Sequence, residues 1–301
     1  MTFQDISDRF EEIKEGLPVS RTGNRFFGEH KSTRRGIGYH FMEITKWRPG
    51  EPFKGIRWRQ AILSNFREIS VVRRMEQKKV PTCLVANISP SMLFQVRDDA
   101  NKGRLLIDLI GAIGFTSSYF HDPVSFIGYS DRIEASVEPG RGTGHIIRIG
   151  QELYDRLELE QRYPEPKPAD CNEALRYVEA HLKGHHTVVL VSDFVEAINN
   201  VGALDWELLG ELAMRHTVIA LVLADPDEFD WTGLGGVALV RRPQTGATDL
   251  VKVKGARNIR ARLLAEQEQL VERFRESNIY AARLTYGDHI DRLTDFFAEG
   301  K

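Results

Sequence analysis

The chain has few of the features that mark extracellular or membrane-spanning proteins. Among 301 residues there are 2 cysteines, Cys83 and Cys171, which cannot supply a disulfide framework. The longest apolar runs, such as residues 217–224, fall far short of the roughly 20 residues that a membrane-spanning helix needs. The first residues lack the basic and then apolar order of a secretory signal peptide. These absences predict a cytoplasmic protein without a membrane span.

Several catalytic and nucleotide-binding motifs are absent as well. The sequence contains no Gly-x-x-x-x-Gly-Lys-Ser/Thr loop and no Gly-x-Ser-x-Gly elbow, and neither cysteine has a histidine beside it in the sequence. Three histidines, His181, His185 and His186, could share a metal ion, but their position around Gly184 at a helix end favours a capping role. We therefore predict no enzyme activity and no tightly bound cofactor, with a hydrolase of undetected type as an open alternative.

Charge is distributed unevenly along the chain. Residues 23–80 carry 14 Lys and Arg against 5 Asp and Glu, a net charge of +9, whereas residues 81–301 carry 24 against 33, a net charge of −9. Residues 1–22 contribute −2. This asymmetry indicates either two parts of one fold that attract each other or a basic surface for nucleic acid or an acidic protein, and the first is the more common origin.

Residues 1–22 have the pattern of a short amphipathic helix. Apolar residues recur there at helical spacing, at Phe3, Ile6, Phe10, Ile13 and Leu17. Acidic residues occupy the positions between them, and Gly16 and Pro18 end the pattern. Such a helix can dock on its own protein or on a partner, and intramolecular docking is the more common outcome.

Residues 23–80 differ in character from the rest of the chain. Glycine occurs there at six positions, and β-branched or alternating pieces lie between the glycines, near residues 39–45 and 69–72. We interpret this basic region as an irregular, β-rich segment that precedes the main domain.

From residue 81 onward, strand and helix patterns alternate. Short continuous apolar runs at 82–86, 187–191 and 217–223 are typical of strands buried on both faces. Helical patterns separate them, which predicts right-handed crossovers and a mainly parallel sheet with helices on both faces. The sequence Pro243-Gln244-Thr245-Gly246 adds a hairpin near residues 237–253. We therefore expect a Rossmann-like α/β module over residues 81–301.

Polar side chains follow two strands of this predicted sheet. Asn87, Ser89 and Ser91 come directly after the first strand, and Asp193 follows the strand at 187–191. In open α/β sheets, ligands bind at the carboxyl ends of strands, so these side chains are expected to lie together. Hydroxyl and carboxylate oxygens are the ligands that Mg²⁺ prefers, which makes Ser89, Ser91 and Asp193 candidate metal ligands.

The loop after the first strand resembles the Asp-x-Ser-x-Ser loop of von Willebrand factor A modules, their metal-ion-dependent adhesion site. The preceding segment is similar to the signature of bacterial domain-of-unknown-function family fifty-eight, which joins that signature to an A-type module. The residues that carry this similarity are Gly28–Ser32, Gly36–Gly38, Phe41, Arg48–Glu51 and Ile56–Arg59. Ser192–Phe194, the helix from Gly142 to Leu157 and the hairpin before a long helix also fit the family. The resemblance extends from about Gly28 to Phe297.

Two positions depart from the pattern of A modules. Asn87 stands where those modules have aspartate, and Ala169 stands where a second loop supplies threonine. Asn87 still offers a carbonyl oxygen but no charge, and Ala169 offers no ligand, so Asp193 is left as the one carboxylate. We therefore expect weak Mg²⁺ binding at most. We predict instead a degenerate metal site that serves as a partner-binding surface and also includes Asp170.

The family resemblance implies a working partner. Members of the family are typically encoded beside MoxR-type AAA+ ATPases, so the resemblance implies a non-catalytic adaptor that helps mature or assemble other proteins. Some of these gene clusters serve the assembly of methanol dehydrogenase, which is one setting that the resemblance implies for this chain. The expected partner is the ATPase, its client protein, or both.

The basic segment carries the alternative function. Arg48, Arg57 and Arg59 lie beside Trp47 and Trp58, a combination that could stack on bases and contact phosphates. No recognisable nucleic-acid motif accompanies them. We expect the tryptophans to pack and the arginines to pair with acids, and we keep nucleic-acid binding through residues 23–80 as the runner-up.

Overall fold

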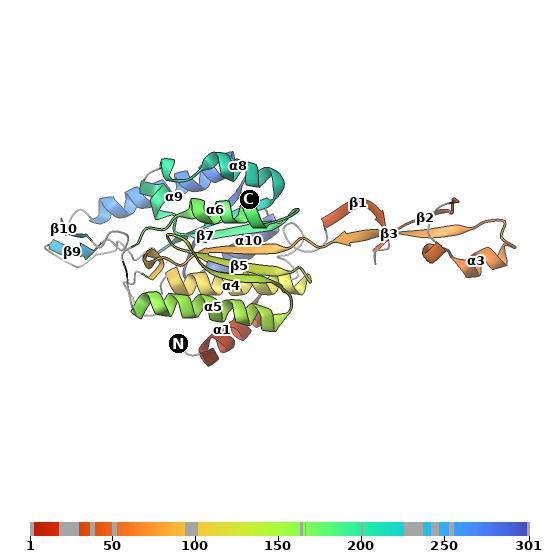
Figure 1. The fold of residues 1–301 in the computed structure, drawn as a ribbon, viewed down its shortest axis with the longest axis horizontal. Helices are drawn as coiled ribbons and strands as arrows, with labels where there is room; N and C mark the ends of the chain where they lie inside the picture. The colour runs from red at the N-terminus through yellow and green to blue at the C-terminus, as the bar shows by residue number, and fades with distance from the viewer. Residues whose placement is uncertain are drawn as a thin grey trace. The chain divides into compact units, whose positions relative to one another are not determined.

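The computed structural model describes residues 3–17, 30–36, 40–49, 53–93, 102–162, 165, 167–199, 201–225, 237–241, 247–252 and 256–299 (Figure 1). The chain forms two compact units. The larger unit comprises Met1–Gly28 and Val80–Lys301, and the smaller unit comprises Glu29–Lys79. The sequence-based division had separated residues 1–22, whereas the structure places helix α1 (Phe3–Gly16) in the larger unit.

The larger unit is built on a six-stranded sheet. Its strand order is β11-β8-β7-β4-β5-β6, and every neighbouring pair is parallel except β5 with β6. The strands are β4 (Thr82–Asn87), β5 (Val124–Tyr129), β6 (Ile133–Gly140), β7 (Thr187–Ser192), β8 (Thr217–Ala224) and β11 (Tyr280–Thr285). The expected Rossmann-like α/β fold, with a mostly parallel sheet flanked by helices, is therefore confirmed.

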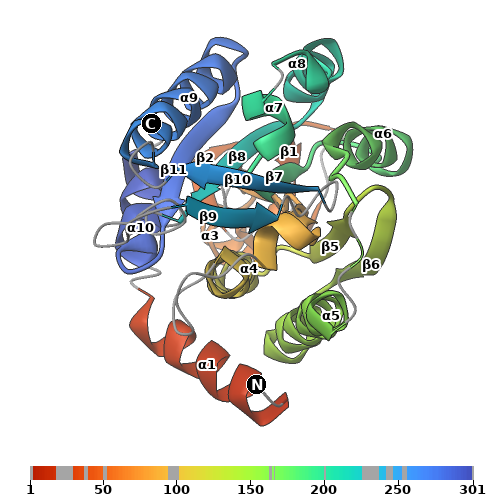
Figure 2. The same ribbon diagram turned by 90° about the vertical axis from the view of Figure 1, so that its left-hand side faces the viewer.

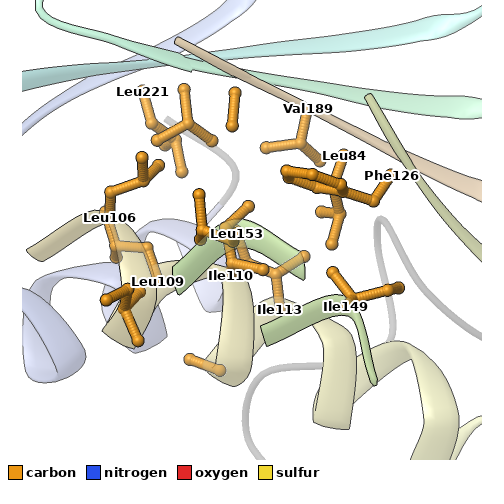
Figure 3. Close-up of a cluster of buried hydrophobic side chains, with 14 of the residues drawn as sticks. Leu84, Leu106, Leu109, Ile110, Ile113, Phe126, Ile149, Leu153, Val189 and Leu221 are labelled. Carbon is orange, nitrogen blue, oxygen red and sulfur yellow. The ribbon is translucent and has the colours of Figure 1, made fainter. Parts of the chain in front are cut away.

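The apolar runs of the sequence become central strands that are buried on both faces. Strands β4, β5 and β7 are buried at all of their positions, because helices cover both sides of the sheet. Alternate residues enter opposite cores: Leu84 and Val189 lie in one, and Val85 and Val188 lie in the other. Figure 3 shows the first core, where Leu106, Ile110 and other aliphatic side chains meet the sheet.

Helices cover both faces of the sheet (Figure 2). The first core packs against α1, α4 (Lys102–Tyr119), α5 (Thr143–Arg162) and α10 (His289–Glu299). The second core packs against α6 (Cys171–His181), α7 (Val195–Asn199), α8 (Trp206–Arg215) and α9 (Ala256–Glu276). Short 3₁₀ turns η2 (Pro90–Leu93) and η3 (Val201–Ala203) lie in loops after β4 and α7. Strands β9 (Val237–Arg241) and β10 (Thr248–Lys252) form the expected hairpin.

Helix α1 docks on its own chain through a buried phenylalanine. Phe10 has no exposed surface, and its ring meets the edge of Phe115 at a centroid distance of 5.6 Å. The ring lies over Gly111 of α4 and Gly150 of α5, where a built Cβ atom would approach it to 2.9 Å and 2.4 Å. Both glycines are therefore needed to let the helices come this close.

A buried polar cluster adds specificity to this docking. The Arg9 guanidinium donates from Nε and Nη2 to the two oxygens of Asp108, at 3.0 Å and 2.6 Å. The His289 ring lies 3.1 Å from the same carboxylate, which joins α1, α4 and α10. Burial would raise the pKa of Asp108, but the hydrogen bonds from His289 and Arg9 outweigh burial and hold it below its usual value.

The smaller unit is an antiparallel sheet of order β1-β3-β2. Its strands are β1 (His30–Gly36), β2 (His40–Lys46) and β3 (Ser70–Lys78), which agrees with the expected β-rich character. The connection from β2 to β3 contains the 3₁₀ turn η1 (Phe53–Gly55) and the short helix α3 (Trp58–Leu63). The sequence analysis did not predict α3.

Candidate functional site

The candidate site lies at β4, from which the chain builds the sheet first in one direction and later in the other. The chain passes from β4 outward to β5 on one side and later returns to pair β7 with the other side of β4. The carboxyl ends of β4 and β7 are therefore neighbours at a topological switch point, the usual position of ligands in open α/β sheets. The structure brings together Asn87, Ser89, Ser91 and Asp193 there, as the sequence predicted.

Asn87 links the two strand ends through its side-chain amide. Its Nδ2 donates to Ser192 Oγ at 3.0 Å and to Asp193 Oδ1 at 3.3 Å. Its Oδ1 accepts from the backbone N–H of Ser89 at 2.8 Å, which fixes the turn after β4. The Ser89 and Ser91 hydroxyls are 3.0 Å apart and share a hydrogen bond. An asparagine can make both the donor and the acceptor contacts, whereas an aspartate could only accept.

An ammonium group lies against the one carboxylate of this cluster. Lys102 Nζ, from the first residue of α4, donates to Asp193 Oδ2 at 2.9 Å, and each side chain is 2% exposed. A helix N-terminus carries partial positive charge, so an ammonium there is unfavourable unless an anion compensates it. Asp193 provides that compensation, and the pair belongs to the class of fully desolvated ion pairs.

The turn after β7 is held in an uncommon backbone conformation. Phe194 has a φ of 48°, in the left-handed region that bulky residues rarely adopt. Its N–H donates to Ser192 Oγ at 3.0 Å, and its buried ring meets Phe274 of α9 at a centroid distance of 5.2 Å. The polar network and the aromatic contact together stabilise the turn that presents Asp193 to Lys102.

A second carboxylate, Glu196, lies close to this pair. Burial and, to a smaller extent, the negative charge of Asp193 together raise the pKa of Glu196 to about 7, although Lys102 opposes both effects. The carboxylate also accepts backbone hydrogen bonds at Glu196 and Ala169. Glu196 therefore ties the loop after β7 to the loop before α6.

The second predicted loop contributes structure to the site through its backbone. Ala169 is buried, and Asp170 caps α6 by accepting hydrogen bonds from the N–H groups of Asn172 and Glu173, at 3.0 Å and 3.3 Å. The Asp170 N–H donates to the Ser130 carbonyl at 2.7 Å, which joins this loop to the end of β5. Asp170 thus acts as a helix cap at the edge of the site.

This set of residues does not fit a divalent cation such as Mg²⁺. A tightly held hard cation needs several oxygen ligands with negative charge among them. Here the Asp193 carboxylate is already paired with an ammonium group, and the Asn87 carbonyl oxygen already accepts a hydrogen bond from a backbone N–H. The side chain of Ala169 has no ligand atom. The predicted residues of this site other than Asp170 are also buried, so they hold the loops in place from beneath the surface.

The other candidate groups are the two cysteines and the histidines before β7. Within the described ranges, no group of three or more His, Cys, Asp or Glu could hold a metal ion. Burial raises the pKa of the free thiols Cys83 and Cys171 to about 11 and about 12, the opposite of what activates a thiol. The backbone N–H of His186 donates to His216 Nδ1 at 3.3 Å, so these histidines join the amino ends of β7 and β8.

The predicted basic residues lie in the smaller unit. Arg48, Arg57 and Arg59 are all exposed. Trp47 packs as expected, stacked on Phe53 with ring centroids 5.6 Å apart. Trp58 does not, because it is 49% exposed, which corrects the prediction that both tryptophans pack.

Two neighbours of Asp193, Lys102 and Glu196, were not predicted from the sequence. Lys102 lies 91 residues before Asp193 and opens a helix, a place where lysine is usually solvated, so sequence spacing gives no signal of the pairing. Glu196 is within one turn of Asp193, and an acidic residue in the first turn of a short helix is ordinary. Only the fold reveals that both lie beside Asp193.

Comparison with known protein families identifies the chain. The family model described as protein of unknown function DUF58 matches residues 43–272, which is most of the sequence. The chain belongs to the DUF58 family. This assignment confirms the family part of the resemblance, and the match to this DUF58 protein spans both structural units. No curated protein matches the sequence.

Two solved structures are similar to this DUF58 protein at low identity. One is described as an aerotolerance-related membrane protein from Bacteroides fragilis, with 13% identity, 74% of this chain and 100% of that chain covered, and a TM-score of 0.43. The other is described as an uncharacterized membrane spanning protein from Vibrio fischeri, with 14% identity, 65% and 99% coverage, and a TM-score of 0.24.

These comparisons correct one prediction. The cytoplasmic location expected from the sequence is contradicted, because both similar structures are of proteins described as membrane proteins. None of the helices in the described residues is both long enough and apolar enough to cross a bilayer.

Proposed function

We propose that this DUF58 protein is a non-catalytic adaptor. Its larger unit acts as a von Willebrand factor A-type module that docks with a MoxR-type AAA+ ATPase, with the client of that ATPase, or with both. The docking serves the maturation or assembly of other proteins. The family resemblance supplies the partner class, and the chemistry of the switch point supports a docking role.

One observation carries this proposal. At the switch point, where an α/β fold commonly holds a ligand or a reactive group, Asn87, Asp193 and Lys102 are buried and bonded to one another. A network that satisfies its own polar groups is suited to holding loops in one shape. A rigid loop surface favours protein docking, since little conformational entropy is lost on binding.

The buried ammonium also determines the mode of docking. In an A module with a bound cation, a carboxylate of the partner completes the shell of the ion. Here the positive charge of Lys102 takes the place of that ion beside Asp193, so no metal is needed to neutralise the carboxylate. Docking by this DUF58 protein is therefore independent of divalent cations.

The contacts themselves come from the exposed rim of the network. Asp131 and Arg132 follow β5 at the same edge of the sheet, and both are exposed. The Ser130 hydroxyl donates to Asp131 Oδ1 at 2.9 Å, and the Ser130 carbonyl binds the Asp170 N–H, so the rim is joined to the loop before α6. These residues are placed to meet a partner directly.

Capture of the full chain by an immobilised MoxR-type ATPase from the same genome tests this function. The ATPase is kept free of nucleotide, because its own nucleotide binding uses magnesium. We expect equal capture with magnesium and with a chelator. Arg132→Glu should weaken capture at least tenfold, since reversing a charge inside an interface costs on the order of 1.4 kcal/mol or more.

The matched control is Lys183→Glu, which makes the same charge change at an exposed position that precedes the amino end of β7. Capture should be unaffected by this variant. Loss of capture on chelation, or equal sensitivity to Arg132→Glu and Lys183→Glu, would contradict ion-independent docking through the carboxyl edge.

A further inference from the structure

An apolar cluster is exposed in the connection between β2 and β3 of the smaller unit. Five large side chains are exposed within 14 residues, and we call this set the α3 patch: Phe53, Trp58, Ile62, Leu63 and Phe66. They are half of the large hydrophobic side chains that are exposed in the described part of the chain. Single exposed apolar residues are normal on proteins, whereas several large ones in one short segment are typical of an interaction surface.

The fold places the α3 patch at one end of the three-stranded sheet. Lys46 pairs with Ser70 at the end of the β2–β3 ladder, so the intervening residues form the loop that closes this end, where Figure 1 shows α3. Ala61 is the one buried residue of α3. Arg57, Trp58 and Leu63 border a hollow of about 430 Å³ at the surface.

The backbone after α3 holds one of these side chains outward. Phe66 has a φ of 60° and Asn65 a φ of 51°, two successive left-handed residues without glycine. The Phe66 N–H donates to the Ala61 carbonyl at 2.8 Å, which fixes this turn, yet the Phe66 side chain is exposed. A positive φ is common for asparagine but unusual for phenylalanine, and such backbone outliers cluster at functional segments.

The charge around the α3 patch has one sign. From Phe53 to Arg67 the chain contains four basic residues and no acidic residue: Lys54, Arg57, Arg59 and Arg67. The three arginines are exposed. The whole unit, residues 29–79, carries 13 Lys and Arg against 5 Asp and Glu, a net charge of +8.

We infer that the α3 patch binds the headgroup region of an anionic lipid bilayer. Exposed Trp, Phe and Leu side chains interleaved with basic residues are the combination by which proteins lie on a membrane surface. The aromatic rings reach the boundary between headgroups and acyl chains, and the arginines meet lipid phosphates. This surface binding needs no membrane-spanning helix, and it is independent of docking at the carboxyl edge of the larger unit.

The shape and composition of the patch favour a lipid surface over other anionic partners. A six-residue helix with flanking turns offers no long groove for a peptide. Nucleic-acid surfaces of this kind use flat aromatic platforms for stacking, and they do not call for exposed Ile and Leu. A bilayer accepts irregular apolar side chains without shape complementarity, and its negative charge complements the arginines.

Sedimentation of the full chain with lipid vesicles tests this inference. We expect binding to vesicles of phosphatidylglycerol and phosphatidylcholine, weaker binding in high salt, and little binding to phosphatidylcholine alone. Trp58→Ser with Leu63→Ser should weaken binding at least tenfold. Arg57→Gln with Arg59→Gln should have a similar effect, because each basic residue near an anionic surface contributes roughly a fivefold factor.

The control is Met214→Ser on α8 of the larger unit, which removes a side chain that is 81% exposed outside the patch and should leave binding unchanged. All substituted side chains are on the surface, and circular dichroism checks that each variant is folded. Leu63→Ser alone serves if the double variant does not fold.

The inference is overturned if the wild-type chain does not bind anionic vesicles. It is also overturned if loss of Trp58 and Leu63 leaves binding intact, because charge alone would then account for the attraction. Binding of single-stranded or duplex oligonucleotides through Arg57 and Arg59, without vesicle binding, would assign the same surface to nucleic acid.

Discussion

Lys102 Nζ donates a hydrogen bond to Asp193 Oδ2 across 2.9 Å, in a pair that is almost fully buried. The pair connects the first residue of α4 to the loop after β7, so it fastens two elements that border the carboxyl edge of the sheet. Its charge balance leaves Asp193 with no excess negative charge to offer a divalent cation. We therefore base the proposal of ion-independent docking on this pair.

Removing the ammonium should destabilise the fold. Lys102→Met would leave the Asp193 carboxylate buried without its cation, a change that typically costs about 3–5 kcal/mol of unfolding free energy. Adding Asp193→Asn should recover much of that loss, because an amide is cheaper to bury than an unpaired charge. Urea denaturation of the single and double variants measures both effects.

Lys14→Met is the matched control, since Lys14 forms an exposed pair with Glu11 at 3.0 Å. Exposed pairs contribute only about 0–1 kcal/mol, so this variant should differ little from the wild type. Equal destabilisation by Lys102→Met and Lys14→Met would mean that the buried pair has no special role.

Glu196 should make the stability fall as pH rises. Burial and the Asp193 charge raise its pKa from 4.5 to about 7. The folded state therefore binds this proton more tightly than the unfolded chain, so the contribution is unfavourable above about pH 7 and absent below about pH 4. Glu196→Gln should raise the unfolding free energy at pH 8 by about 2 kcal/mol, after allowance for partial exposure.

Denaturation curves at pH 4.5, 6, 7 and 8 give this pH dependence. The difference between Glu196→Gln and the wild type should grow across that range. The exposed residue Glu207 provides the control, because Glu207→Gln should show a constant, small difference. A constant difference for Glu196→Gln as well would contradict a neutral carboxyl at this position.

The docking of α1 should be sensitive to one methyl group on α5. In Gly150→Ala, the new Cβ would lie 2.4 Å from the Phe10 ring, so either the ring or the helix must shift. Overpacking of this kind costs about 1–3 kcal/mol, against a gain of up to about 1 kcal/mol from helix propensity. We expect a net loss of stability in thermal or chemical unfolding.

Gly210→Ala on α8 is the matched comparison, because nothing lies within 4 Å of a Cβ built there. That variant should be neutral or more stable than the wild type. If Gly150→Ala stabilised the protein as much as Gly210→Ala, the close contact between Phe10 and α5 would not exist in solution.

Much of the larger unit could be predicted from hydrophobic patterns. The apolar runs that became β4, β7 and β8 are continuous because both faces are buried, and the helical stripes between them are long. The placement of Asn87, Ser89, Ser91 and Asp193 at one edge followed from parallel topology alone. The intramolecular docking of α1 was the expected one of two alternatives.

The remaining features depend on contacts that no local pattern encodes. Lys102 and Asp193 meet only after the sheet has assembled, and the burial of both could not be foreseen from their sequence neighbours. The helix α3 is short, and its exposed Trp58 and Leu63 give it no buried stripe to reveal it. Burial raises the pKa of Glu196, and the sequence around Glu196 does not reveal that the residue is shielded from water.

A crystal structure of the protein grown with manganese, whose anomalous scattering identifies a bound ion, tests the ion-independent site most directly. We expect Lys102 Nζ to remain hydrogen-bonded to Asp193 and no anomalous peak to lie within the cluster. An octahedral ion held by Ser89, Ser91 and Asp193, with Lys102 displaced, would contradict this expectation.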